Sequence, residues 1–189
     1  MGRADERIWS QAVETILAAL GERQPVPSAP VVLIDGRSGS GKSTVAGQLA
    51  AEIPGSQLVR LDDLYPGWDG LAAGSLQVVT SVLDAVNPGW VRWDWQADAA
   101  AECHSLDAAR PLIVEGCGAL SRAAREKATL GVWIECPEPI RKRRALDRDG
   151  ETYSPHWARW AEQESRFIAR EHPQTIADLV ITEGEPTSV

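Results

Sequence analysis

The sequence predicts an α/β fold in which a mostly five-stranded parallel sheet is flanked by helices on both faces. Short apolar runs typical of buried strands recur along the chain, namely "VVLI", "SQLVRL", "PLIVEG", "LGVWIE" and "ADLVIT". Most of them are separated by stretches with helical spacing, and such alternation is typical of a parallel sheet wrapped by helices. The chain has 189 residues, which suits one domain with a single substantial core.

The expected elements follow each other in a simple order. Residues 1–29 should form an N-terminal helix, through about Leu20, and a connector rich in proline. A further helix is expected from Leu71 to Val86, where "NPG" stops it. The stretch "WVRWDWQAD" fits either a short strand or a packed loop and stays unassigned. Residues from about 137 to 172 should hold a helical lid and the helix that follows it, within one domain covering residues 1–189.

Charge, apolar content and cysteine spacing limit the kinds of partner, compartment and metal site that we expect for this protein. The formal net charge of −8 argues against broad binding to nucleic acid or to an anionic membrane, because both depend on clustered Lys and Arg. The apolar runs are too short to span a bilayer, and the acidic N-terminus is unlike a signal peptide, so a cytoplasmic protein is expected. Three cysteines without metal-ligand spacing support neither a disulfide framework nor a zinc site.

The most specific signal is "GRSGSGKST", which follows the first predicted strand and precedes a predicted helix. It matches the phosphate-binding pattern G-x-x-x-x-G-K-[ST] in the structural context that this pattern requires. The curled backbone directs N–H groups inward, the helix start adds partial positive charge, and Lys42 adds a full charge. We therefore expect a nucleoside triphosphate here, with Ser43 as a Mg²⁺ ligand. The residues expected to bind it are Gly36, Arg37, Ser38, Gly39, Ser40, Gly41, Lys42, Ser43 and Thr44.

Acidic residues follow several of the predicted strands, at the edge of the sheet where ligands bind in parallel α/β folds. Asp62 is our choice for a base that accepts the proton of an attacking hydroxyl and holds the nucleophile in line. Asp63 is its alternative. Glu115 could orient Mg²⁺ or contact the acceptor, so the predicted metal site comprises Ser43, Asp62 and Glu115.

The densest group of cations lies in "PEPIRKRRALDRDG". At helical spacing Arg141, Arg144 and Arg148 share one face, while Arg143 and Asp147 can pair with each other. Three arginines on one face of an acidic protein suit a clamp on transferring phosphates, and the alternative is a solvated basic face. This helix is the predicted lid, and Arg144 and Arg148 are predicted to contact the nucleotide and to assist catalysis.

The helix after the lid carries an aromatic stripe that core packing explains. Glu164 lies on this stripe, where it could pair with a lid arginine or stay partly exposed at its edge. The histidines lack partners at recognisable spacing, so no catalytic histidine is expected: these are His104, His156 and His172.

In this order, the motifs resemble those of the P-loop small-molecule kinases. The resemblance is strongest to the uridine kinase-like group, which includes phosphoribulokinase-type and pantothenate kinase-type enzymes. It covers about residues 30–182 and rests on "GRSGSGKST", "LDDLY", "LIVEG", "RALDRD" and "ADLVI". It implies a three-layer P-loop NTPase fold, with ATP and Mg²⁺ as cofactors and Asp62 as catalytic base. It further implies that Arg144 and Arg148 lie in a lid over ATP and that Glu115 lies near the metal and the acceptor.

The acceptor stays open, because "PGWDGLAAGS" and "GWVRWDW" do not match the nucleoside-binding segments of true uridine kinases. Aromatic rings could stack on a base or a sugar face, and carboxylates could accept hydrogen bonds from hydroxyls or an amine. Tryptophans that close a small core are an equal alternative. The candidate substrate residues are Asp62, Tyr65, Trp68, Asp69, Trp93, Asp94 and Glu115, with Trp95 as a further ring.

The sequence thus favours a kinase that phosphorylates a hydroxyl of a small polar molecule, such as a nucleoside or a sugar. A nucleoside monophosphate kinase would need more cations for its acceptor, and Arg92 and Arg110 are the only Lys or Arg residues between Asp62 and Glu115. A non-catalytic ATP-binding regulator is the other alternative, while a switch GTPase is disfavoured because no Asn-Lys-x-Asp motif is present. The oligomeric state is open, with a dimer among the options.

Overall fold

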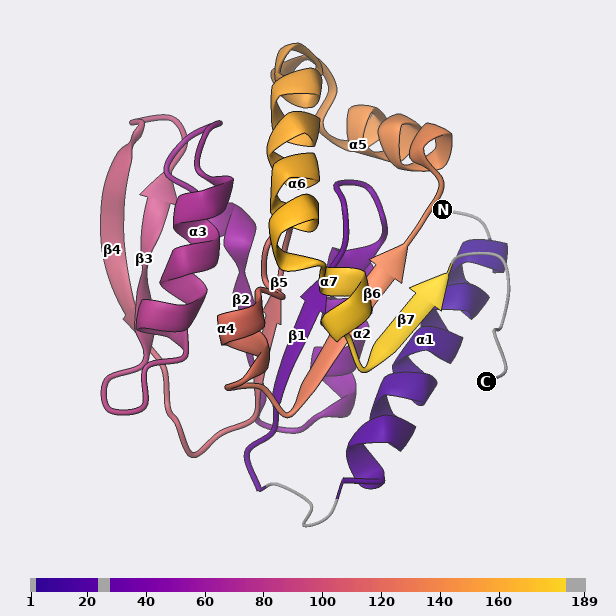
Figure 1. Ribbon diagram of the computed structural model, residues 1–189, viewed down its shortest axis with the longest axis vertical. Coiled ribbons are helices and arrows are strands. Elements are labelled where there is room, and N and C mark those ends of the chain that lie inside the picture. Colours follow the sequence, from indigo (N-terminus) through magenta and orange to yellow (C-terminus); the bar gives the residue numbers. More distant parts are fainter. Residues whose placement is uncertain (1–2, 24–27, 183–189) are drawn as a thin grey trace.

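The computed structural model describes residues 3–23 and 28–182, and its centre is a parallel sheet (Figure 1). The strand order is β2-β5-β1-β6-β7, and every neighbouring pair runs parallel. The predicted five-stranded parallel sheet is therefore confirmed. Its strands are β1 (Val31–Asp35), β2 (Gln57–Arg60), β5 (Leu112–Glu115), β6 (Leu130–Glu135) and β7 (Leu179–Thr182).

Helices cover both faces of the sheet. Successive residues of its strands point to opposite faces, so both faces carry apolar side chains that must be buried. Val32 and Ile34 pack in one core cluster with α1 (Arg3–Gly21) and α2 (Lys42–Glu52). Leu33, between them, belongs to a second cluster on the other face. That face is covered by α3 (Leu71–Gln77), α4 (Arg122–Arg125) and α6 (Trp157–Glu171), and α7 (Pro173–Ile176) precedes the last strand.

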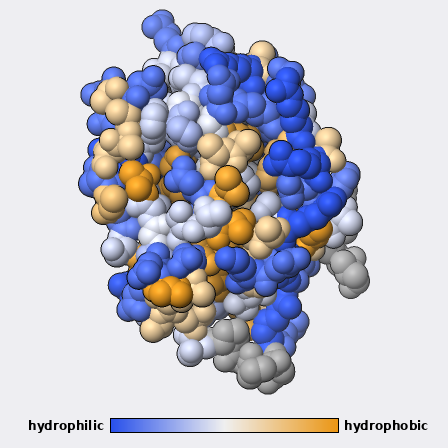
Figure 2. Space-filling view, turned by 60° about the vertical axis from the view of Figure 1, so that its left-hand side comes forward, coloured by the Kyte–Doolittle hydropathy of each residue, from blue (hydrophilic) through white to orange (hydrophobic). Residues whose placement is uncertain are grey.

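The tryptophan-rich segment that the sequence left unassigned forms a hairpin beside the main sheet. Strands β3 (Gly89–Asp94) and β4 (Ala99–Ser105) pair antiparallel, with an irregularity between Val91 and Trp93. Before it, α3 continues into a π-helical turn, η2 (Val78–Val82), so the helix ends earlier than the predicted Val86. On the face of the molecule that Figure 2 shows, apolar residues form separate groups among hydrophilic ones.

The predicted lid region holds two helices joined by a sharp turn. Helix α5 (Glu138–Tyr153) lies beyond the carboxyl end of β6, and α6 returns toward the sheet after the short η3 (Ser154–His156) (Figure 1). The kink in α5 is at Gly150, where φ is 52° and ψ is −130°. None of the helices in the described ranges has the length and apolarity that a membrane span requires.

Candidate active site

The phosphate-binding motif forms the tight turn that its sequence predicts, between β1 and α2. Gly39 and Gly41 have φ of 78° and 98°, a region that favours glycine. Space is also lacking: a Cβ at Gly39 would clash with the backbone carbonyl of Arg141, and one at Gly41 with the indole of Trp9. Both glycines are therefore required by conformation and by close packing against α5 and α1.

Lys42, the first residue of α2, is buried under the turn. Its ammonium donates to the carbonyl of Arg37 at 3.2 Å and lies 3.5 Å from the Cys117 sulfur. Burial lowers the pKa of Lys42, but anionic groups around it, Glu115 and Asp62 among them, outweigh this and raise it overall. Burial also raises the pKa of the Cys117 thiol far above its usual range, so the thiol is neutral. Several neighbouring groups thus favour the charged form of Lys42.

Glu115 ends strand β5 and meets the start of α2. Glu115 is 2% exposed, and its carboxyl lies close to the side chain of Ser43. Burial raises the pKa of this carboxyl, although the charge of Lys42 opposes the rise. The guanidinium of Arg60 lies 3.7 Å from the Glu115 carboxylate. The acid at the end of β5 and a hydroxyl of the phosphate-binding motif therefore lie next to each other at the sheet edge.

Asp62 and Asp63 lie in a single 3-10 turn, η1 (Leu61–Asp63), directly after β2. The side chain of Asp62 is exposed, while its backbone carbonyl accepts a hydrogen bond from the indole of Trp95 at 2.8 Å. Asp63 is half-buried, and both this burial and the charge of Asp62 raise its pKa. Of the two acids, Asp62 is the one whose carboxylate is open to solvent at the edge shared with Lys42.

A cavity of about 540 Å³ lies between the phosphate-binding turn and α5. Arg144 and Arg148 both line it, together with Lys42 and Ser43. The guanidinium of Arg144 also lies 5.7 Å from the ring centroid of Trp9, within the range of cation–π contacts. The structure thus brings both predicted lid arginines to the turn that was predicted to bind nucleotide.

Two details of the predicted lid face are wrong. Arg141 is only 3% exposed and does not point into the cavity with Arg144 and Arg148. Its guanidinium instead donates to the carbonyls of Cys136 and Ser38, at 3.0 and 3.1 Å. In addition, Arg143 and Asp147 line the cavity, although their spacing had suggested a pair apart from it.

Three of the predicted substrate residues are engaged within the protein. Tyr65 is 1% exposed, donates to the carbonyl of Cys117 at 2.8 Å and leaves no ring face open to a substrate. Asp69 forms an ion pair with Arg159. Asp94 accepts hydrogen bonds from the backbone N–H groups of the hairpin turn, Gln96 and Ala97. Packing and turn formation account for these side chains without an acceptor.

The tryptophans of the acceptor side lie in an aromatic cluster rather than on an open platform. Trp68 stacks on His156, with ring centroids 4.2 Å apart and planes at 11°, and on Tyr153 at 5.5 Å. Trp95 of the hairpin contacts the same ring at 5.0 Å. Trp93 is half-buried, and its indole N–H is buried without a hydrogen-bond partner among the described residues. The cluster joins the loop after Asp62 to the hairpin and to η3.

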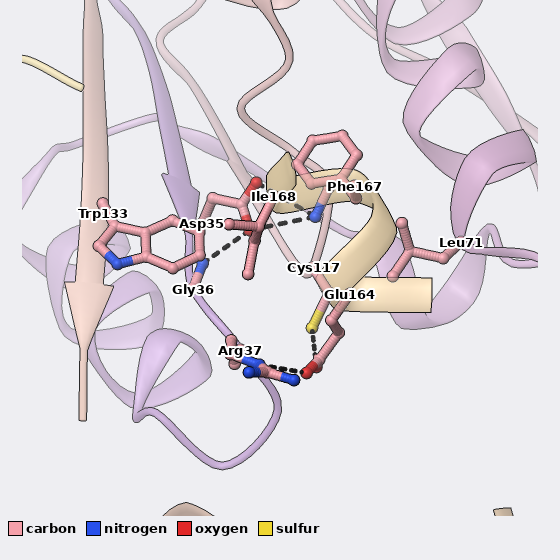
Figure 3. A pocket seen from close by; sticks show the side chains of 10 residues that line it. Asp35, Gly36, Arg37, Leu71, Cys117, Trp133, Glu164, Phe167 and Ile168 are labelled. Atoms are coloured by element: carbon pink, nitrogen blue, oxygen red, sulfur yellow. Dashed lines mark hydrogen bonds and ion pairs between the residues drawn. The ribbon is translucent and has the colours of Figure 1, made fainter. Parts of the chain in front are cut away.

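Two carboxylates hold the site together; sequence reasoning missed Asp35 and did not predict the partner of Glu164 (Figure 3). Asp35, at the end of β1, accepts hydrogen bonds from the N–H groups of Gly36, Gly118 and Leu120 at 2.7 to 3.1 Å. Glu164 pairs with Arg37 of the phosphate-binding turn, at 2.9 Å, rather than with a lid arginine. Its place on the buried stripe was the only signal in the sequence. The cavity between these groups measures about 10 Å³, enough for a single water molecule only.

Comparisons with known proteins agree with this architecture. The structure of a possible uridine kinase from Bacillus stearothermophilus matches with a TM-score of 0.62 and 19% identity, over 93% of this chain and 98% of that one. A candidate fructose transport system kinase from Silicibacter sp. TM1040 matches with a TM-score of 0.56 and 20% identity, over 91% and 98% of the two chains. At these identities the likeness shows a shared fold. Among curated proteins, none matches the sequence significantly.

The phosphate-binding turn and α5 both lie within a region that a known family describes. The AAA domain family matches residues 32–167, which is most of the chain. With the phosphate-binding turn, or P-loop (residues 36–44), between β1 and α2, the protein belongs to the AAA domain family.

Proposed function

We propose that the protein is an ATP-dependent kinase that transfers the γ-phosphoryl group to a hydroxyl of a small polar molecule, nucleoside-like or sugar-like. One observation carries this proposal. Lys42, Ser43 and Glu115 meet at the carboxyl edge of the sheet, beside the exposed carboxylate of Asp62. Phosphoryl transfer depends mainly on positioning and on charge stabilisation, and these groups can supply both.

The nucleotide would occupy the cavity between the P-loop and α5. Backbone N–H groups at the start of α2 and the Lys42 ammonium suit the phosphates of ATP. Arg144 and Arg148 line the opposite side of the same cavity, where their charge can stabilise the transferring phosphoryl group. The volume of about 540 Å³ lies in the usual range for small-molecule sites.

The residues present also fit Mg²⁺. Ser43 and Glu115 offer a hydroxyl and a carboxylate that lie close to each other, and Mg²⁺ prefers oxygen ligands. Within the described residues there is no group of three or more His, Cys, Asp or Glu arranged to hold a metal. Mg²⁺ bound to ATP normally uses one or two protein ligands and completes its shell with phosphates and water. Bound there, it would neutralise phosphate charge during transfer.

Asp62 would act on the acceptor. Its carboxylate is exposed at the site edge, so it can accept the proton of an acceptor hydroxyl and orient the oxygen toward the phosphoryl group. The bond from the Trp95 indole to its backbone carbonyl fixes the turn that carries it. Asp63, being half-buried and next to Asp62, serves better as a support of this turn than as a second base.

The charges on the acceptor side favour an acceptor without a phosphate group. The nearby arginines are already engaged with acids: Arg60 with Glu115, Arg92 with Glu102 and Arg159 with Asp69. A nucleoside monophosphate would compete with these carboxylates for its phosphate contacts. This observation favours the hydroxyl kinase over the monophosphate kinase.

The test is a screen of ATP consumption with Mg²⁺ against nucleosides, sugars, aminosugars, vitamins and nucleoside monophosphates, with Lys42→Ala as the inactive control. Turnover that depends on a hydroxyl compound would support the proposal. Turnover with monophosphates alone would establish the rival kinase. ATP binding with no acceptor-dependent turnover in any arm would favour a non-catalytic regulator.

A further inference from the structure

The peptide groups of Ser38, in the P-loop, are held from two sides by buried side chains of opposite charge. The Ser38 N–H donates to the Glu164 carboxylate at 2.7 Å, and the Ser38 carbonyl accepts from the Arg141 guanidinium at 3.1 Å. Both charged side chains are 3% exposed. They come from the two helices of the lid region, Glu164 from α6 and Arg141 from α5.

Glu164 has further partners that fix its position (Figure 3). Its second oxygen accepts from Arg37 Nε at 2.9 Å, and the Cys117 thiol donates to the first at 3.3 Å. Arg37 also donates to the carbonyl of Ala161, one turn earlier on α6, at 3.1 Å. One carboxylate therefore joins two consecutive P-loop residues and the loop after β5 to a single helix.

Neither contact is explained by general core packing. A buried charge is costly unless it is paired and hydrogen-bonded, and each of these two side chains directs one of its hydrogen bonds to the backbone of Ser38. Gly39 follows directly and packs against the backbone of Arg141 so closely that a side chain would not fit. The start of the P-loop thus lies in a slot formed by α5 and α6.

We propose that Glu164 is a positioning residue for phosphoryl transfer, with Arg141 as its counterpart across Ser38. Glu164 does not touch the reacting atoms; it sets the path of the P-loop, and thereby the direction of the N–H groups and of Lys42. It also couples that path to the lid helices. The expected effect of Glu164 on the turnover rate rests on the proposed kinase function. The expected effect on nucleotide affinity does not.

The test compares Glu164→Gln with Glu162→Gln, since Glu162 lies on the same helix but is exposed and pairs with Arg166 alone among the described residues. Displacing reacting groups by about 1 Å costs up to roughly 100-fold in rate. For Glu164→Gln we expect turnover at saturating substrates to fall by about 10- to 100-fold and ATP affinity by about tenfold. Glu162→Gln should match the wild type in both.

Melting temperature separates positioning from a structural role. A purely structural Glu164 would lower the melting temperature and leave the rate and ATP affinity of the folded molecules unchanged, which would overturn the proposal. If Glu164→Gln does not fold, Glu164→Asp decides, because it keeps the charge and shortens the reach to Ser38; wild-type affinity and rate in that variant would equally overturn it. Should the wild type turn over no acceptor, the proposed function fails, and ATP affinity measured by calorimetry still tests the positioning role.

A double-variant cycle tests the partnership with Arg141. Arg141→Lys keeps the charge but cannot donate to two carbonyls in the guanidinium geometry. If both residues act through Ser38, the combined variant should lose clearly less ATP affinity than the product of the two single losses. Losses that multiply within error would show independent roles and remove Arg141 from the proposal.

Discussion

The carboxylate of Asp35 accepts a hydrogen bond from the backbone N–H of Leu120 at 2.8 Å, across 85 positions of sequence. It accepts another from Gly118 at 3.0 Å, so the end of β1 and the loop after β5 are joined beneath the P-loop. Burial raises the pKa of Asp35 to about 6 even though these N–H groups oppose the rise. One carboxylate thus joins the end of β1, which leads into the P-loop and Lys42, to the loop that follows Glu115.

This relationship predicts a dependence of stability on pH. The pKa of Asp35 is about 6 in the folded protein, against an ordinary value of 3.8, so the folded state binds more protons between these two pH values. The contribution of Asp35 to the free energy of unfolding is then fully present below about pH 4 and is lost as pH rises through 6, by at most about 3 kcal/mol. Urea unfolding from pH 4 to 7.5 should show a flatter pH profile for Asp35→Asn than for the wild type; identical profiles would refute the assignment.

The sheet and the P-loop could be predicted because their signals are local. An apolar run of four or five residues indicates a buried strand without reference to the rest of the chain, and the P-loop pattern needs only its own strand and helix. The hairpin could not be predicted, because its local pattern is irregular. Its register shifts between Val91 and Trp93, which interrupts the regular alternation that a strand would show.

Contacts that hold the site depend on tertiary structure, and spacing alone could not predict them. Helical spacing correctly placed Arg144 and Arg148 together, but Arg141 lies in the first turn of α5, against the end of β6 and the P-loop, and is therefore buried. Glu164 reaches Ser38 across 126 positions. Tyr65 looked available because loop residues carry no periodicity from which burial can be inferred.

Lys42→Ala should abolish ATP turnover and weaken ATP binding while the fold persists. The substitution removes the one full positive charge that the P-loop itself directs at the phosphates. Melting temperature and ATP affinity should be measured together, because Lys42 is buried and its loss must be separated from unfolding. Wild-type turnover in a folded Lys42→Ala protein would remove the basis of the kinase assignment.

Gly150→Ala should destabilise the protein by about 1–3 kcal/mol, the usual cost of a sparsely populated backbone conformation. A Cβ at Gly150 would meet no atom within 4 Å, so its effect isolates the strain at φ 52°. Gly47→Ala is the matched control, because Gly47 lies inside α2 with equal space around it and should become slightly more stable. Denaturant unfolding measures both; equal changes in the two variants would show that the kink of α5 tolerates a side chain.

Arg144→Ala and Arg148→Ala should each lower the turnover rate by about 10- to 100-fold and weaken ATP binding less. Charges that line the cavity opposite the P-loop act mostly on the phosphoryl group as its charge spreads in the transition state. Arg166→Ala, at an exposed position of α6, controls for the loss of one positive charge. Steady-state kinetics with ATP and acceptor varied separately gives both quantities, and wild-type rates in both lid variants would leave α5 without a catalytic role.

Asp62→Asn should separate a hydroxyl kinase from a passive nucleotide binder. The substitution keeps the size of the side chain and removes the base, so acceptor-dependent turnover should fall by roughly 10² to 10⁴. ATP binding should barely change, because the Asp62 carboxylate is exposed at the acceptor edge while Lys42, Ser43 and Glu115 stay in place. A role as metal ligand would instead weaken binding of Mg²⁺ and ATP along with turnover.

Asp63→Asn is the matched control for that experiment, because it makes the same substitution one residue away, on a half-buried side chain in the same turn. Nucleotide affinity, melting temperature and acceptor-dependent rate should be measured on both variants. If Asp62→Asn retains full activity and Asp63→Asn loses it, the base is Asp63. That result would also mean that the turn opens during the reaction, because the half-buried carboxylate would have to reach the acceptor.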